Sequence, residues 1–310
     1  YTLSLHDALP ILHSFPTRRS SDQIGRASCR ERLAPCDITR KAESVGVAKA
    51  TSSTKILLIL GVLAGMFIGL AGQFYLIATF DTGMNPSITR LLGGMAFSLG
   101  LVLVVIAGAE LFTGNTLLIV SCLSRKITVR QLLRNWVLVY LGNLAGSLIV
   151  VGLSYFAHQW ALGGLTLGTH AVAVAAGKTA LPFSVSFVRA ILANVLVVLA
   201  VWMSFAGRSL TDKIAGIILP ITAFVASGFE HSVANMFFVP FGLLVARHPE
   251  MALALPAGAP LETLTWPSFI LHSLIPSTLG NIVGGVLFVG LLYWYVYIAC
   301  AENKDRMQKE

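Results

Sequence analysis

The sequence predicts an all-α membrane protein with six spanning helices, two of which are broken. Three observations lead to this prediction. The 310 residues are 55% hydrophobic and only 12% charged, about half the charged fraction of an average soluble domain. The apolar residues form long runs, and roughly 20 residues suffice for one helix to cross a bilayer. Two runs exceed that length and carry glycines and a carboxylate in their middle.

Residues 1–32 are set apart from the rest of the chain. YTLSLHDALPI (1–11) and HSFPTRRSSD (13–22) can be encoded by one DNA string read in two frames. IGRASCRER (24–32) fits the reverse complement of the same string. Because three unrelated peptides share one nucleotide sequence, we interpret residues 1–32 as translated sequencing-adapter DNA. A signal peptide is a poorer interpretation, since this stretch lacks an adequate apolar segment.

The remaining chain divides into a mixed segment at 33–54, a membrane channel domain at 55–301 and a charged tail at 302–310. Loose helical spacing of apolar residues in the first of these predicts an amphipathic helix on the membrane surface. The apolar runs of the membrane domain are 56–80, 91–123, 136–156, 187–205, 214–245 and 269–301. We expect the stretches 81–90 and 158–184 to be connecting turns and loops.

Positive charge indicates the orientation of the helices. Lys and Arg gather in the N-terminal segment, in the loops 124–134 and 207–213, and in the tail. By the positive-inside rule both termini are cytoplasmic. Lys178 and Arg247 then lie on the outer side as isolated charges. Since the basic residues behind the net charge of +8 sit in short loops and termini, nucleic-acid binding is not expected.

The predicted break in the fifth run contains Gly228, Glu230 and His231, and the predicted break in the second run contains Gly108 and Glu110. Ionisable groups at membrane depth are costly and usually mark a functional site. A repeat supports the pairing of the two breaks: LGNLAGSL at 141–148 matches LGNIVGGV at 279–286. Three spans per half predict inverted repeats, and paired broken helices in such repeats point to a substrate path near the midplane.

The chemistry of the breaks favours small anions, because half-helix N-termini attract negative charge. His231 can donate a hydrogen bond or a proton to such an anion; the alternative is a hydrogen-bonded histidine of the core. Glu230 is expected to accept backbone N–H groups of its turn. Four apolar residues are candidates for constrictions, with simple helix packing as the alternative for each: Phe97, Leu101, Phe112 and Phe224.

In these motifs the chain resembles the formate–nitrite transporter family. The resemblance covers roughly residues 36–300 and rests on the following stretches: GAELFT (108–113), Asn194 with AVWM (200–203), GRSL (207–210) and ASGFEHSVAN (226–235). It implies an aquaporin-like protomer in a homopentamer, with one pore per protomer, in the bacterial inner membrane.

The resemblance also implies roles for single residues. His231 matches the pore histidine and Thr113 its hydrogen-bonding partner, while Lys178 matches a lysine that draws anions to the periplasmic vestibule. Asn194 matches a pore-lining amide, and the four apolar candidates match constriction positions. Glu230 and Asn235 complete the predicted substrate pathway. No cofactor or metal is expected, and the cysteines at 29, 36, 122 and 300 have neither metal-ligand spacing nor a disulfide pattern.

We therefore expect a passive or proton-linked carrier of small monovalent anions, formate first. WMSFAGRSL (202–210) most resembles formate channels, but Gly114-Asn115-Thr116 is nearer to nitrite and hydrosulfide members, so these anions remain alternatives. A neutral-solute channel of aquaporin type is the competing class, although the sequence lacks paired Asn-Pro-Ala motifs. An enzyme is not expected, since the sequence shows no catalytic triad, and Glu230 and His231 have no second carboxylate or metal triad beside them.

Overall fold

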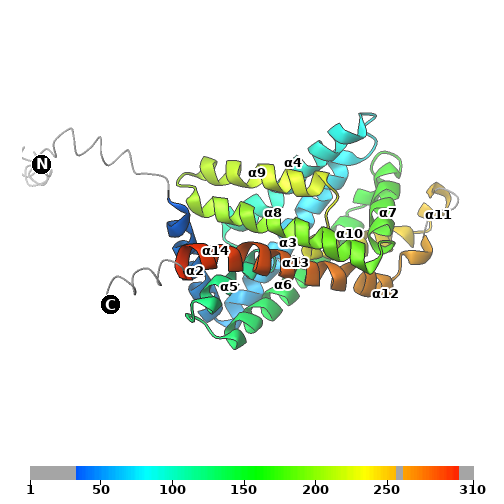
Figure 1. Cartoon of the computed structure of the whole chain (residues 1–310). Coiled ribbons are helices and arrows are strands. Elements are labelled where there is room, and N and C mark those ends of the chain that lie inside the picture. Colours follow the sequence, from blue (N-terminus) through cyan, green and yellow to red (C-terminus); the bar gives the residue numbers. More distant parts are fainter. Residues whose placement is uncertain (1–32, 256–260, 300–310) are drawn as a thin grey trace, which may run out of the picture. The chain divides into compact units, whose positions relative to one another are not determined.

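The computed structural model describes residues 33–255 and 261–299, and those residues form helices and short connections without a strand (Figure 1). The predicted all-α class is thus confirmed. Five helices are long and apolar enough to cross a membrane: α3 (Thr54–Thr79), α4 (Pro86–Ala107), α6 (Val129–Phe156), α8 (Phe183–Ala206) and the C-terminal span Trp266–Ala299. This last span includes α12 (Trp266–Ser268), α13 (Ile275–Gly285) and α14 (Leu292–Trp294), with π-helical turns between them. The segments 1–32 and 302–310 lie outside the described residues.

The second apolar run is interrupted where the sequence predicts. Helix α4 ends at Ala107, and Gly108 follows with φ of 80° in the left-handed region, which glycine adopts without a steric penalty. The chain then leaves the helix before a 3-10 turn at Gly114–Leu117 and the short helix α5 (Leu118–Leu123).

The fifth run is interrupted in the same manner. Helix α9 (Leu210–Ala226) ends before Gly228, whose φ is 69°, and α10 (Ser232–Ala246) begins directly after His231. Neither α9 nor α10 reaches 20 residues, so this run crosses as two pieces joined by an irregular segment. The opposite orientation of the two halves of the chain stays a prediction.

Two connections are more helical than expected. The stretch 158–184 contains α7 (Thr166–Thr179), so Lys178 lies in the last turn of a helix and not in a loop. The turn at 81–90 is shorter than predicted, because α4 begins at Pro86 with Asn85 as its cap. Proline is well suited to a first helical position, where no N–H partner is needed. Between α10 and the C-terminal span lie the short helix α11 (Met251–Ala254) and a 3-10 turn at Leu261–Thr263.

The N-terminal segment forms the helix α2 (Pro35–Thr51), which contacts α5, α6 and α8. The expected helix at 33–54 is therefore present. Its buried residues include Ala42 and Gly46, and a Cβ on Gly46 would collide with the hydroxyl of Ser121 in α5. Such close packing indicates that α2 is part of the compact unit that begins at Pro35 and not a loosely attached surface helix.

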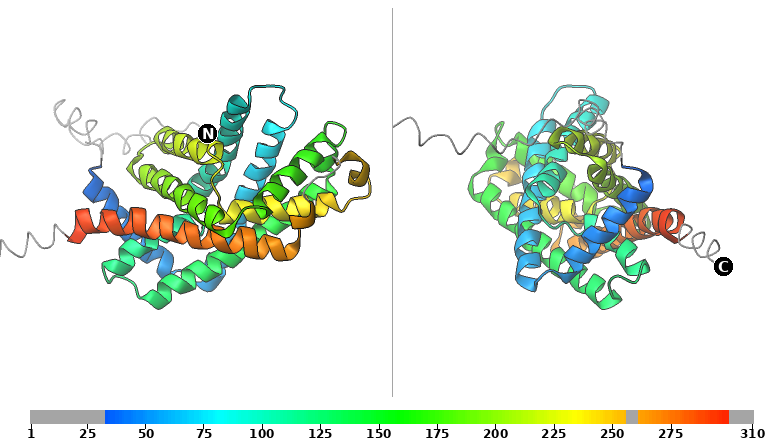
Figure 2. Two further views of the ribbon diagram at one scale, coloured as in Figure 1. Left: turned by 45° about the vertical axis from the view of Figure 1, so that its right-hand side comes forward. Right: turned by 90° about the vertical axis from the view of Figure 1, so that its left-hand side faces the viewer.

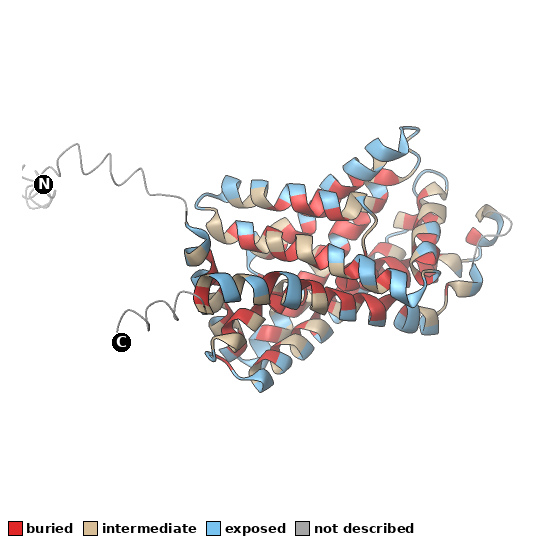
Figure 3. Cartoon of the chain, viewed as in Figure 1, coloured by how far each residue is buried: buried red, intermediate tan, exposed pale blue. Residues whose placement is uncertain are grey.

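The long helices pack closely in pairs (Figures 1 and 2). Helix α3 lies along α6, α13 lies along α8, and α4 lies between α3 and α9. At the α3–α6 contact, Gly61 faces Gly142 so directly that a Cβ on Gly142 would lie 2.9 Å from the Gly61 Cα. Small residues allow this approach in a membrane, where van der Waals packing drives helix association. Figure 3 shows exposed residues along the outer helix faces and buried ones between the helices.

Candidate functional site

His231 lines a cavity of about 90 Å³ beside the second break. The walls come from α3, α4, α7, α9 and α10 and include Tyr75, Phe97, Lys178, Phe224, Glu230 and Phe238. The imidazole is only 2% exposed, although it belongs to a residue in extended backbone between two helices. Irregular backbone at this depth is tolerated where it lines a cavity, as it does here.

The two breaks meet through a hydrogen bond between Thr113 and His231. The Thr113 Oγ1 lies 2.9 Å from the His231 Nε2, and both residues are buried. Thr113 belongs to the first break and His231 to the second, 118 positions further along the chain. The structure therefore brings together the histidine and threonine that the family resemblance paired.

The other ring nitrogen of His231 fixes the tautomer. The Ala234 backbone N–H donates to the His231 Nδ1 over 3.1 Å, so this nitrogen must be a lone-pair acceptor. A neutral imidazole with an acceptor Nδ1 carries its proton on Nε2, which then donates to Thr113 Oγ1. An imidazolium has donors on both nitrogens and cannot accept the Ala234 bond. The local geometry thus suits a neutral ring whose hydrogen-bond donor faces Thr113.

Lys178 and Glu230 form a buried ion pair at the same cavity. The Lys178 Nζ lies 3.1 Å from the Glu230 Oε2 and 5.6 Å from the centre of the Phe238 ring. Asn235 donates to the same carboxylate over 2.8 Å and to Ser273 over 2.9 Å. The expectation that Glu230 accepts backbone N–H groups was wrong: its carboxylate is bound by the side chains of Lys178, from α7, and Asn235.

A matching arrangement at the first break was missed by the sequence analysis. The Lys49 Nζ, from α2, lies 3.1 Å from the Glu110 Oε2, and Asn115 donates to that oxygen over 2.7 Å. In each break an asparagine follows the glutamate by five positions. That spacing was readable in the sequence, whereas the choice of Lys49 among the basic residues of the N-terminal segment was not.

The repeated LGN motifs hold both breaks in place. Asn143 accepts the Phe112 N–H and donates to the carbonyls of Glu110 and Gly61. Asn281 accepts the Ser232 N–H and donates to the carbonyls of Glu230 and Ala190.

These six bonds span 2.8 to 3.1 Å. Four of them satisfy backbone groups of the breaks, and the other two reach carbonyls of the neighbouring helices α3 and α8. The repeat seen in the sequence therefore places two equivalent asparagines, Asn143 and Asn281, that hold the backbone of the two breaks.

The four predicted constriction residues do not lie together. Phe97 and Phe224 face one another with ring centres 5.9 Å apart, and both line the His231 cavity. Leu101, one helical turn from Phe97, lines a second cavity of about 200 Å³. Phe112 lies elsewhere, with its ring against Trp136 and Tyr140 on the side of α6. Its position corrects the prediction: in the turn that forms the break, the Phe112 side chain lies against α6 and does not line the His231 cavity.

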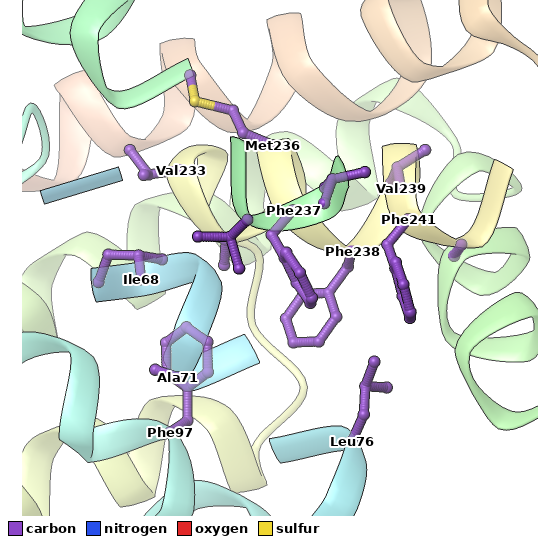
Figure 4. Packing of buried hydrophobic residues seen from close by; sticks show 14 of the residues in the cluster. Ile68, Ala71, Leu76, Phe97, Val233, Met236, Phe237, Phe238, Val239 and Phe241 are labelled. Atoms are coloured by element: carbon purple, nitrogen blue, oxygen red, sulfur yellow. The ribbon is translucent and has the colours of Figure 1, made fainter. Parts of the chain in front are cut away.

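Two aromatic residues that were not predicted complete the His231 cavity. Phe238 stacks on Phe97, with ring centres 6.1 Å apart, and meets Tyr75 edge to face. Figure 4 shows Phe238 beside Phe237 on α10, with Phe97 across from them. Helical spacing alone does not distinguish such residues from ordinary core residues, so the sequence offered no signal for them.

Asn194 occupies a bracing position. Its Nδ2 donates to the carbonyls of Thr113 and Asn281 and to the Thr116 hydroxyl. It is fully buried and ties the first break to α13. The expectation of a pore-lining amide is not met by these contacts. Within residues 33–255 and 261–299, no group of three His, Cys, Asp or Glu side chains is suited to hold a metal.

The second cavity lies between α2, α4 and the first break. It is lined by Lys49, Glu110, Leu101 and Phe205, among others. Phe97 faces the His231 cavity and Leu101 this one, so about 6 Å of helix α4 separates the two levels. A spanning helical bundle with interrupted helices and two internal cavities, one of them lined by a buried histidine, is the architecture of a membrane transport protein.

Comparison with known proteins gives the family. The model for the formate/nitrite transporter family matches residues 37–295, and the chain belongs to this family. The formate channel FocA of Escherichia coli K12 is 44% identical over 271 residues, which cover 86% of this chain and 95% of that protein. FocA of Haemophilus influenzae is 40% identical, covering 85% of this chain and 94% of its own length. A solved structure described as a pentameric formate channel with formate bound matches with a TM-score of 0.71 and 43% identity, covering 79% and 98% of the two chains.

Proposed function

We propose that this protein is a channel for small monovalent anions, with formate as its main substrate, in the bacterial inner membrane. The family membership and the names of the relatives at 40–44% identity support formate. The observation that carries the proposal is the Thr113–His231 pair, because its His231 ring lines a cavity at the junction of two broken helices. By analogy with the pentameric relative, we infer a homopentamer, and the basic inner loops support cytoplasmic termini.

In this proposal an anion that reaches the His231 cavity shares the His231 Nε2–H with Thr113, and the ring keeps its place. The Thr113 hydroxyl accepts from His231, so its own proton is not used by that bond and can donate as well. The ring stays neutral throughout, because Ala234 holds Nδ1 as an acceptor. His231 thus acts as a hydrogen-bond donor to the anion and not as a permanent cation.

Lys178 contributes a compensated charge. Because Glu230 neutralises it at 3.1 Å, the pair does not form a deep well in which an anion would be trapped. A bound anion can compete with Glu230 for the ammonium group, since Lys178 has three donors. Conduction requires binding that is favourable but weak enough to allow release.

Nitrite and hydrosulfide remain alternative substrates to be tested. The sequence feature that favoured them, Gly114-Asn115-Thr116, does not face the His231 cavity. Asn115 binds Glu110 and Asn135, and Thr116 binds the Thr113 carbonyl. These two side chains are therefore structural, and they do not argue for nitrite over formate.

The test is formate flux into proteoliposomes containing His231→Phe, with His272→Phe as the matched control. His272 is exposed on the C-terminal span. Losing one hydrogen bond to an anion costs about 1.5–3 kcal/mol, so we expect flux to fall about 10- to 150-fold in the first variant and to stay unchanged in the control. Unchanged formate flux in His231→Phe would overturn the proposal. The same vesicles assayed with formate, nitrite, hydrosulfide and glycerol distinguish the substrates and the neutral-solute class.

A further inference from the structure

A third cavity lies outward from the His231 site and is not part of the function described above. Its volume is about 330 Å³, and it is lined by Tyr75, Thr79, Met84, Pro86, Thr89, Arg90 and His170. These residues come from the end of α3, the start of α4, the connection between these two helices and the middle of α7. The cavity contains an arginine and several hydrogen-bonding side chains, which an apolar lipid-facing pocket does not require.

Its position follows from the helices that it shares with the His231 cavity. On α4, Arg90 lies seven residues before Phe97, or about 10 Å along the axis. On α7, His170 lies eight residues before Lys178, about 12 Å away. Tyr75 lines both cavities. The third cavity is therefore the next level along the same helices, reached past the Tyr75 ring.

Arg90 carries a positive charge that no carboxylate neutralises. Among the described residues its side chain has no hydrogen bond or ion pair, although its charge acts on the Tyr75 hydroxyl. The nearest acidic residue in sequence, Asp81, is exposed in the preceding turn and does not line the cavity. Lys178, by contrast, is bound to Glu230. Among the residues that line these two cavities, Arg90 is thus the cation without an ion pair.

The rest of the cavity is held rigidly around that charge. Thr79 Oγ1 donates to the Tyr75 carbonyl, so it accepts from His170 Nε2 over 2.8 Å, and the His170 ring is fixed. One turn after Arg90, Gly93 lets α4 touch α3, since a Cβ there would lie 2.6 Å from the Thr79 methyl and 2.7 Å from the Tyr75 ring. The donors available to a ligand are the Arg90 guanidinium and the Tyr75 hydroxyl.

We propose that this cavity, with Arg90 and Tyr75 as its donors, is an outer binding station for a small carboxylate anion on its way to His231. A guanidinium matches the two oxygens of a carboxylate with paired N–H donors. The inference rests on the proposed function and refines it: Arg90, and not Lys178, receives the anion first. The anion then passes Tyr75 into the His231 cavity.

The experiment measures formate flux against formate concentration in phosphatidylcholine vesicles containing Arg90→Gln. We expect the half-saturating concentration to rise about three- to tenfold, the range for a water-exposed charge-assisted bond, with little change in maximal flux. Arg90→Lys should recover part of the effect as a point charge without paired donors. Tyr75→Phe, which keeps the ring against Phe238, should also raise the half-saturating formate concentration, but by less than Arg90→Gln.

The matched control is Arg247→Gln, which removes an exposed arginine at the end of α10, outside the lining of this cavity. Equal shifts in the two glutamine variants would mean a general surface charge effect and would overturn the inference. An Arg90→Gln effect that occurs only when phosphatidylglycerol is added would also overturn it, since the arginine would then bind a lipid phosphate. Absence of formate flux in the wild type would instead refute the proposed function itself, and the station with it.

Discussion

The two breaks are built from the same parts but differ in one respect. Each has a glycine with positive φ, a glutamate bound by a lysine and an asparagine, and an LGN asparagine that brackets the backbone. With Glu110 matched to Glu230, the position of His231 corresponds to Leu111 in the first break. The residues that both breaks share stabilise an interrupted helix inside a membrane, whereas the His231 imidazole and its partner Thr113 have no counterpart at the other break. The residues that stabilise the breaks are thus distinct from those that we propose to bind the anion.

The largest expected effect tests whether Asn143 and Asn281 stabilise the two breaks equally. Asn281→Ala leaves the Ser232 N–H and the Glu230 carbonyl without their partner, whereas the Ala190 carbonyl lies inside the helix α8. Each unpaired buried group costs about 1–3 kcal/mol, so we expect a loss of about 3 kcal/mol or more in the free energy of unfolding. Asn143→Ala should lose a similar amount. Denaturant unfolding in mixed micelles measures both, and a clear difference between the two variants would contradict the equivalence.

The ion pairs should differ because water reaches one of them more easily. The side chains of Lys178 and Glu230 are 16% and 5% exposed, against 27% and 9% for Lys49 and Glu110. Removing one partner of a buried pair costs about 3–5 kcal/mol, which we expect for Glu230→Gln. Glu110→Gln should cost less, since solvent reaches the lysine that it leaves. The same unfolding assay compares them, and a larger loss in Glu110→Gln would show that burial does not rank the pairs.

A smaller effect is expected from the Thr113–His231 hydrogen bond, which is not among the contacts that the two breaks share. Thr113→Val removes the acceptor of the buried His231 N–H, at a cost of about 1–3 kcal/mol. Thr113→Ser keeps the hydroxyl and serves as the control. Nitrogen-15 NMR of labelled histidine reads the site directly: the wild type should show His231 as the neutral tautomer protonated at Nε2. An Nδ1-protonated or cationic signal would refute the assigned donor direction.

The smallest effect concerns how the helices before the breaks begin. Asp212 caps α9 together with Ser209, whose backbone N–H and hydroxyl lower the pKa of the exposed Asp212 carboxyl. A lowered folded pKa contributes stability that is present above the unfolded value and lost as pH falls through the folded value. Asp212→Asn should therefore reduce the loss of thermal stability below about pH 4, with no counterpart at α4, which Asn85 caps without charge. The measurement is the melting temperature against pH, and an identical loss below about pH 4 in the wild type and in Asp212→Asn would contradict this prediction.

Much of the fold was predictable because its signals are local. Runs of apolar residues, glycines at Gly108 and Gly228, and the repeated LGN motif each act through neighbouring backbone. The helix α7 was also within reach, since THAVAVAAGK is rich in alanine, the strongest helix former. It was missed because its polar ends and glycine favoured a loop.

The candidate site was predictable only in part. His231, Thr113 and Lys178 were identified, but the partner of Lys178 and the role of Lys49 were not. Phe112 was misplaced because it lies in an irregular turn, where helical spacing does not give the direction of a side chain. Distance along the chain carries no information about such contacts: Lys49 and Glu110 are 61 positions apart.

The sequence by itself determined that this chain spans a membrane, where its helices break, and which family it belongs to. Hydropathy and backbone conformation depend on residues within a few positions, and family motifs are read directly. Only the tertiary structure decided which carboxylates Lys49 and Lys178 bind, which nitrogen of His231 carries the proton, and that Arg90 has no carboxylate partner within residues 33–255 and 261–299. These are properties of side chains brought together from distant segments, and their energies depend on distance and burial.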